Sequence, residues 1–129
     1  MWIVIAWVLG GAGAMVMGHE AAHAVVTRAL GGQVEGLTWR WFGAVGVRLR
    51  VDGLSRVQVA WTLLAAPVAE GLVVGALWML QPELVGIWLA LLIAQWGMNL
   101  VPWPGIPNDG RRLWHLWHTG SVEPISERT

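Results

Sequence analysis

The sequence contains no cysteine, no lysine and no tyrosine. Without cysteine, the chain can form neither a disulfide nor a thiolate metal site. Charged residues make up only 12% of the 129 positions, against about 25% in ordinary soluble domains. The eight basic residues are all arginine and are balanced by eight acidic ones, so the chain lacks the excess of basic charge typical of nucleic-acid binding. A mostly charged, water-facing surface is excluded as well.

Hydrophobic residues make up 56% of the chain, and 11 of these are tryptophan. Tryptophan favours the boundary between membrane and water, because its ring is apolar and its N–H needs a partner. The apolar N-terminus, "MWIVIAW", carries no basic residue, unlike a cleaved secretory signal. We therefore expect a lipid bilayer to be the main solvent of this protein.

Three apolar segments are long enough to form membrane-spanning helices, at about residues 2–28, 57–80 and 84–101. A spanning helix needs about 20 mostly apolar residues, in a range of about 17–25. The short "QPE" stretch at Gln81 to Glu83 predicts a tight turn that joins the second and third segments. The expected fold is an all-α membrane protein with three transmembrane helices.

The arginines predict the orientation of these helices. They lie either between the first and second segments or after the third: Arg28, Arg40, Arg48, Arg50, Arg56, Arg111, Arg112 and Arg128. Three spans place both regions on one side of the membrane, and the positive-inside rule makes that side cytoplasmic. We expect the N-terminus outside and the C-terminus in the cytoplasm.

The stretch at about residues 34–52, which contains "VEGLTWRWFGAVGVRLRV", alternates between apolar and polar side chains around glycines. Period-two alternation around a glycine-containing turn predicts a β-hairpin. We expect this hairpin to lie at the cytoplasmic membrane interface, between the first two helices. The whole core should then cover residues 1–119, followed by a polar tail at 120–129.

The motif "HEAAH" lies within the first apolar segment and places His19, Glu20 and His23 on a helix. Residues four apart share one helix face, so the two imidazoles can hold one Zn²⁺. Glu20 beside them can take a proton from a water that the metal activates. Ionisable groups inside a membrane cost at least about 2.5–3.5 kcal/mol each and are usually functional. The motif therefore predicts a catalytic zinc site rather than two packing histidines.

A catalytic zinc usually has three protein ligands and one open position. The candidates for the third ligand are Asp109, Glu70, His115 and His118. Asp109 follows the third segment in a proline-rich stretch, and broken backbone at membrane depth is tolerated where it lines a cavity. Such a loop could return Asp109 toward the histidines.

Two motifs in this order resemble the site-2 protease family of intramembrane zinc metalloproteases. The matching residues are Gly18-His19-Glu20-Ala21-Ala22-His23, Asn99-Leu100-Val101-Pro102 and Asp109-Gly110. The stretch "AAPVAEG" at Ala65 to Gly71 is also similar to that family's G-P-x-x-N element. The resemblance covers about residues 18–117, nearly the whole chain.

The resemblance implies that His19, His23 and Asp109 hold the zinc and that Glu20 is the general base. It also implies that Asn99 is a polar residue close to the metal, where it helps to hold the substrate or the oxyanion. The β-hairpin would be the edge that receives an unwound strand of a transmembrane protein substrate. Strand addition satisfies the backbone groups that unwinding exposes.

The sequence also departs from the family pattern. "WPGIPN" lengthens the usual spacing between Asn99 and Asp109, and Ala66 and Glu70 stand where the family has Gly and Asn. Glu70 has three alternatives: a substitute hydrogen-bonding group, a metal ligand, or a protonated carboxyl paired across helices. The Asp-Gly context and the proline-broken loop favour Asp109 over Glu70 as the third ligand.

The expected function is that of an intramembrane zinc endopeptidase that hydrolyses peptide bonds of transmembrane substrates with a zinc-activated water. Two alternatives remain: a catalytically silent, zinc-binding membrane scaffold, and a membrane zincin of another type with Glu70 as ligand. His115 and His118, in "RRLWHLWH", are interpreted as part of a helix that lies at the membrane interface.

Overall fold

The computed structural model describes residues 1–39 and 45–121. Its elements, in chain order, are α1 (Trp2–Ala29), β1 (Gln33–Trp39), β2 (Val45–Arg50), α2 (Arg56–Leu80), the 3₁₀ turn η2 (Pro82–Leu84), α3 (Val85–Leu100) and α4 (Asp109–Thr119). The expected helical fold with a hairpin between the first two long helices is confirmed. The hairpin turn and the polar tail beyond residue 121 lie outside the described residues.

The three long helices are those that the apolar segments predict. The helical stretches Trp2–Ala29, Arg56–Leu80 and Pro82–Leu100 are each long and apolar enough to cross a membrane. The turn between the last two is η2, and it shortens α3 by one residue relative to the expected start. This pattern of length and composition indicates a membrane protein.

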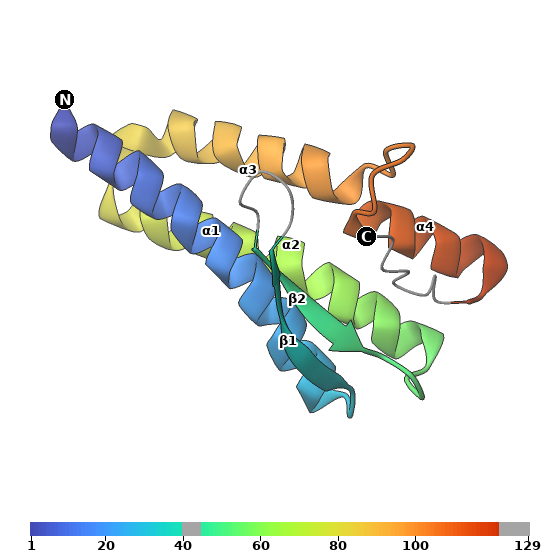
Figure 1. The fold of residues 1–129 in the computed structure, drawn as a ribbon. Helices are drawn as coiled ribbons and strands as arrows, with labels where there is room; N and C mark the ends of the chain where they lie inside the picture. The colour runs from blue at the N-terminus through green and yellow to red at the C-terminus, as the bar shows by residue number, and fades with distance from the viewer. Residues whose placement is uncertain (40–44, 122–129) are drawn as a thin grey trace.

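Figure 1 shows α1 and α2 side by side along much of their length, with α3 packed across one end of the pair. A glycine permits the close approach of α1 and α3, because a Cβ on Gly11 would lie 2.6 Å from the ring of Trp88. The hairpin lies along the C-terminal half of α1, and α4 lies against α2 and the end of α3.

Polar side chains lie inside the bundle and many apolar ones face outward. The buried positions of α1 recur every four residues: Gly11, Met15, His19, His23 and Thr27. Side chains on the outer faces are strongly exposed, among them Met17 (74%), Leu72 (72%) and Ile93 (69%). This is the reverse of a water-soluble helix, whose exposed face is polar. It is the arrangement expected where lipid surrounds the helices.

Two apolar clusters pack along the bundle. Met15, Val74, Leu77, Trp88 and Leu92 form the first cluster, and Val59, Leu63 and Leu116 form the second. Two of the long helices also bury polar residues: His19, His23 and Thr27 on α1, and Thr62 and Glu70 on α2. The first cluster joins α1, α2 and α3, and the second joins α2 and α4.

The hairpin pairs β1 with β2 in antiparallel register, with Leu37 opposite Val47 and Trp39 opposite Val45. The register shifts between Val34 and Gly36, so one extra residue of β1 bulges out of the ladder. These bounds agree with the predicted range of about 34–52. Because the hairpin contacts α1, it lies next to the helix that carries the H-E-x-x-H motif.

Candidate metal centre

α1 presents its two motif histidines toward the inside of the bundle. His19 and His23 are both buried, and their ring centroids lie 4.7 Å apart with the rings nearly perpendicular, at 85°. Glu20, the next residue after His19, leaves the helix in another direction, because successive helical residues are rotated by about 100°. The same helical turn therefore provides two inward imidazoles and one carboxylate that faces the hairpin.

Each imidazole is held through its Nδ1 atom by a residue of α2. The Nδ1 of His23 lies 2.8 Å from the carbonyl oxygen of Thr62, and the Nδ1 of His19 lies 2.7 Å from Oε1 of Glu70. A carbonyl oxygen only accepts hydrogen bonds, so the Nδ1 of His23 donates. An ionised Glu70 likewise requires His19 to donate. In their neutral forms both rings then present the lone pair of Nε2 on the opposite side.

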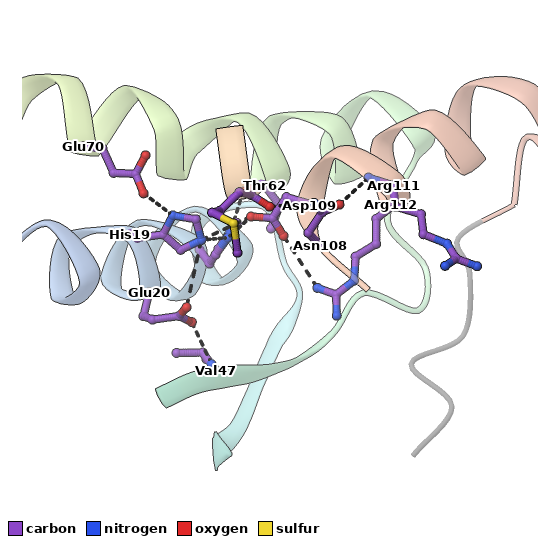
Figure 2. A network of polar contacts seen from close by, with 11 residues as sticks. His19, Glu20, Val47, Thr62, Glu70, Asn108, Asp109, Arg111 and Arg112 are labelled. Atoms are coloured by element: carbon purple, nitrogen blue, oxygen red, sulfur yellow. Dashed lines mark hydrogen bonds and ion pairs between the residues drawn. The ribbon is translucent and has the colours of Figure 1, made fainter. Parts of the chain in front are cut away.

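Asp109 completes a triangle with these two Nε2 atoms (Figure 2). Its Oδ2 lies 3.2 Å from Nε2 of His19 and 3.0 Å from Nε2 of His23, and the two Nε2 atoms are 3.2 Å apart. Within the described residues, these three side chains form a buried group whose ligand atoms are close enough to hold one metal ion.

The dimensions of this triangle fit a zinc ion. Bonds of about 2.0–2.1 Å in a tetrahedral site place neighbouring ligand atoms about 3.3 Å apart, close to the three measured edges. Three electron-pair acceptors that face one another repel unless a positive charge lies among them. A proton could supply it, because the same contacts are ion pairs when an imidazole is protonated. A metal ion supplies it while both imidazoles stay neutral.

The environment of Asp109 favours its ionised form. Burial alone would raise the pKa of this carboxyl, but hydrogen bonds from His19 and His23, which form when an imidazole carries a proton on Nε2, outweigh that effect and hold the pKa below its usual range. The second oxygen, Oδ1, lies 3.7 Å from a guanidinium nitrogen of Arg112, one helical turn further along α4. The carboxylate is therefore available as a ligand through Oδ2.

Asn108 returns the chain to the site after the proline-rich loop. It is the N-cap of α4, where its Oδ1 accepts the backbone N–H of Arg111 at 2.9 Å. Its Nδ2 donates to the carbonyl oxygens of Met98 and Val101, at 2.7 and 2.6 Å, at the end of α3. One side chain thus joins the free carbonyls of one helix to the free N–H groups of the next. Asp109 is the first residue after this junction.

The contact between α4 and the end of α3 explains why a glycine, Gly110, follows Asp109. A Cβ at this position would collide with the carbonyl group of Leu100, because α4 begins directly against the end of α3. The lengthened "WPGIPN" spacing therefore does not remove Asp109 from the histidines. The loop is folded back, and the two helix ends touch.

Glu20 lies beside the triangle and is bound to the hairpin. Its Oε1 is 4.0 Å from Nε2 of His19, and its Oε2 accepts the backbone N–H of Val47 at 2.8 Å. In an antiparallel strand, each N–H points to one side only. The Val47 N–H that reaches Glu20 therefore belongs to the edge of β2 that faces away from β1.

The other predicted site residues lie outside this group. Asn99, in the last turn of α3, is half-buried and makes no side-chain hydrogen bond to any described residue. His118 stacks on Trp114 in α4, at a ring distance of 3.8 Å, and neither His115 nor His118 belongs to the triangle. The proposed role of Asn99 stays a prediction from the family resemblance.

Sequence analysis missed Asn108. An N-cap signal was present, because Asn directly after Pro107 and before an Asp-Gly pair is typical of a helix start. The family resemblance directed attention to Asn99 instead. Only the contacts with Met98 and Val101 reveal that Asn108 positions Asp109.

Replacing Asn108 with alanine is expected to loosen the junction between α3 and α4. The cap and two carbonyl partners are lost together, so unfolding should become easier by about 1–2 kcal/mol. Zinc should bind more weakly because Asp109 is less well held. Thermal unfolding and zinc titration of the detergent-solubilised protein measure both effects. Asn99→Ala is the matched control and should change neither; equal behaviour of the two variants would contradict the role of Asn108.

Comparisons with known proteins found no relative: no protein family, no curated protein and no solved structure matches this chain. The function is therefore inferred from the geometry of the site and from the motifs that form it.

Proposed function

We propose that this protein is an intramembrane zinc endopeptidase that hydrolyses peptide bonds of transmembrane substrates. One observation carries the proposal: Nε2 of His19, Nε2 of His23 and Oδ2 of Asp109 converge in a triangle of 3.0–3.2 Å edges, with the Glu20 carboxylate beside it. Two nitrogens and one carboxylate oxygen are a ligand set typical of catalytic zinc.

Charge balance supports a divalent ion. Asp109 and Glu70 are both buried next to the two imidazoles, and buried charges are costly unless they are compensated. A dication balances two carboxylates while both imidazoles stay neutral, whereas protons would have to charge both imidazoles to do the same. The absence of cysteine leaves nitrogen and oxygen ligands, which suit zinc better than copper(I) or an iron–sulfur cluster.

The catalytic role follows from where Glu20 lies. When bound, the zinc would polarise the scissile carbonyl and lower the pKa of a water toward about 7. Glu20 takes a proton from that water as the oxygen bonds to the carbonyl carbon. The C–N bond then breaks, and Glu20 delivers the proton to the leaving amine. Its position next to His19, on the exposed side of the triangle, fits this exchange.

The substrate would be an unwound segment of a transmembrane protein. A helix hides its carbonyl groups, so the segment must be extended before a water can attack. The outer edge of β2, which faces away from β1, would pair with an extended chain, and the hydrogen bond from the Val47 N–H places that edge directly at Glu20. The substrate strand would therefore run between the hairpin and the metal.

The orientation of the protein also belongs to this proposal. Apart from Arg128, the arginines lie in and around the hairpin and in the first turn of α4, and the positive-inside rule then places both elements on the cytoplasmic side. The N-terminus and η2 would face outward. The exposed tryptophans of α4, Trp114 and Trp117, would lie among the lipid headgroups.

A zinc-binding scaffold without activity is the second candidate. The buried His–His–Asp group by itself would serve such a scaffold. Glu20 distinguishes the two functions, because a scaffold needs no carboxylate beside the metal. A membrane zincin that uses Glu70 as its third ligand is a further alternative. Its metal content would fall to a low level if Glu70 were removed.

Glu20→Gln is expected to abolish cleavage of transmembrane peptides while zinc remains bound. The amide keeps the size of the side chain but cannot accept the proton. Peptide cleavage in detergent or liposomes, together with metal content, measures both properties. Unchanged hydrolysis in Glu20→Gln would rule out the proposed base, and stoichiometric zinc without turnover in the unmodified protein would favour the scaffold.

Asp109→Ala is expected to lower zinc affinity by at least about 10-fold, since one of three ligands is lost. Equilibrium dialysis against a chelator of known affinity gives the dissociation constants. Asp52→Asn, at an exposed carboxylate of the hairpin end, is the control and should bind zinc normally. If the unmodified protein binds no zinc, a proton rather than a metal holds the triangle together.

Val47→Pro removes the backbone N–H that holds Glu20. Proline is tolerated at a strand edge, so the hairpin should persist. A lost hydrogen bond to a charged group is worth about 1.5–3 kcal/mol, which predicts a fall in kcat/KM of about 10- to 100-fold. Zinc binding should not change. Full activity in this variant would show that the edge of β2 does not position the base.

A further inference from the structure

Glu70 is the most deeply buried charged residue among those the structure describes, with 0% of its surface exposed, and it lies near the middle of α2. A carboxylate buried between apolar, membrane-length helices is costly, so its presence calls for a function. The sequence left three roles open: a hydrogen-bonding substitute for Asn, a metal ligand, and a carboxyl paired across helices.

The contacts of Glu70 separate these roles. Its Oε1 lies 2.7 Å from Nδ1 of His19, which is the ring nitrogen that faces away from the triangle. Its Oε2 has no hydrogen-bond partner within the described part of the chain. Glu70 is not part of the group that can hold the metal ion. It touches the site through His19.

We propose that Glu70 is a positioning residue that accepts the Nδ1–H of His19 and so makes Nε2 the metal-binding atom of that ring. This inference rests on the proposed zinc site. A histidine ring can bind a metal through either nitrogen, and the partner of the other nitrogen decides which one. With Glu70 in place, the ring of His19 is fixed in the orientation that points Nε2 at Asp109 and His23.

The two histidines are held by different kinds of acceptor. His23 donates to the carbonyl of Thr62, whose position is fixed by the backbone of α2. His19 meets a carboxylate, and a hydrogen bond to a charged acceptor is shorter and about twice as strong as one between neutral groups. It also makes the ligand nitrogen more basic. Because the acceptor at Thr62 is a backbone oxygen, only the acceptor at Glu70 can be removed by a side-chain substitution.

The test compares the zinc affinity of the full chain in detergent for three variants. Glu70→Gln keeps the size and an acceptor oxygen but loses the charge, and it should bind zinc about 10-fold more weakly. Glu70→Leu removes the acceptor and should lose about 100-fold. Glu83→Gln, in the exposed turn η2, is the control for the loss of a carboxylate and should stay within about twofold of the unmodified protein.

Cobalt(II) substitution gives a readout that a merely structural role would not move. Its visible absorption reports ligand type and geometry, so both Glu70 variants should shift the spectrum, with Glu70→Gln closer to the unmodified protein. Unchanged zinc affinity and an unchanged cobalt spectrum in Glu70→Gln and Glu70→Leu would overturn the proposal. X-ray absorption that shows one fewer oxygen ligand in Glu70→Gln would also overturn it, because Glu70 would then be a direct ligand.

The result is distinguishable from a failure of the proposed zinc site. If the unmodified protein binds no zinc, the zinc site itself is wrong, and the positioning role falls with it. If the unmodified protein binds zinc and Asp109→Ala weakens it, the site stands and the Glu70 variants alone decide this inference. Should Glu70→Leu fail to fold, Glu70→Gln still decides it, because the amide is isosteric.

Discussion

Three electron-pair acceptors that face one another inside a helix bundle are the constraint on which this structure depends. At 3.0–3.2 Å, Nε2 of His19, Nε2 of His23 and Oδ2 of Asp109 repel one another as lone-pair acceptors, so a shared proton or a metal ion must lie among them. The acceptors come from α1 and α4, at opposite ends of the sequence, so a proton or metal ion held among them would join the two ends of the chain. Metal binding and folding would then be coupled, because a site of this kind does not exist in the unfolded chain. The cost of burying polar groups between helices is offset where those groups share a cation and hydrogen-bond to α2.

The surroundings of the triangle show why it can persist in an apolar bundle. Each of its members has a second partner: Glu70 for His19, the Thr62 carbonyl for His23 and Arg112 for Asp109. One apolar cluster packs α1, α2 and α3 together, and the other packs α4 against α2. Because the outer faces are apolar, lipid can surround the bundle without reaching the site. In this arrangement polar residues lie inside the bundle and apolar ones outside, which is the reverse of a soluble protein. Charged groups are then more favourably placed inside the bundle than on its outer faces.

The sequence predicts local features well and long-range contacts poorly. The spacing of His19 and His23, the three apolar helices and the alternating hairpin all follow from periodicity within short windows. The contact between His19 and Glu70 spans 51 positions, and nothing in either segment specifies that Oε1 should meet Nδ1 rather than the metal. The return of Asp109 depends on Asn108 and on the missing Cβ of Gly110, which matter only once α4 begins against the end of α3. The resemblance to the family pattern pointed to Asp109-Gly110, but the need for a glycine at this position follows only from the tertiary packing.

The different directions in which His19, Glu20 and His23 leave α1 follow from helix geometry alone. Adjacent residues are rotated by about 100°, so a helix that turns His19 and His23 into the bundle must turn Glu20 toward a different neighbour. In this fold that neighbour is β2, and its backbone N–H from Val47 meets the carboxylate. Glu20 therefore lies between the two imidazoles on one side and the outer edge of β2 on the other. An extended chain bound to that edge would bring its carbonyl groups past both. A helical chain would not, since its backbone groups are already paired with one another. Under the proposed function, the helix geometry that turns both histidines of H-E-x-x-H inward would therefore also favour unwound segments as substrates, because a strand edge lies against the next face of the helix.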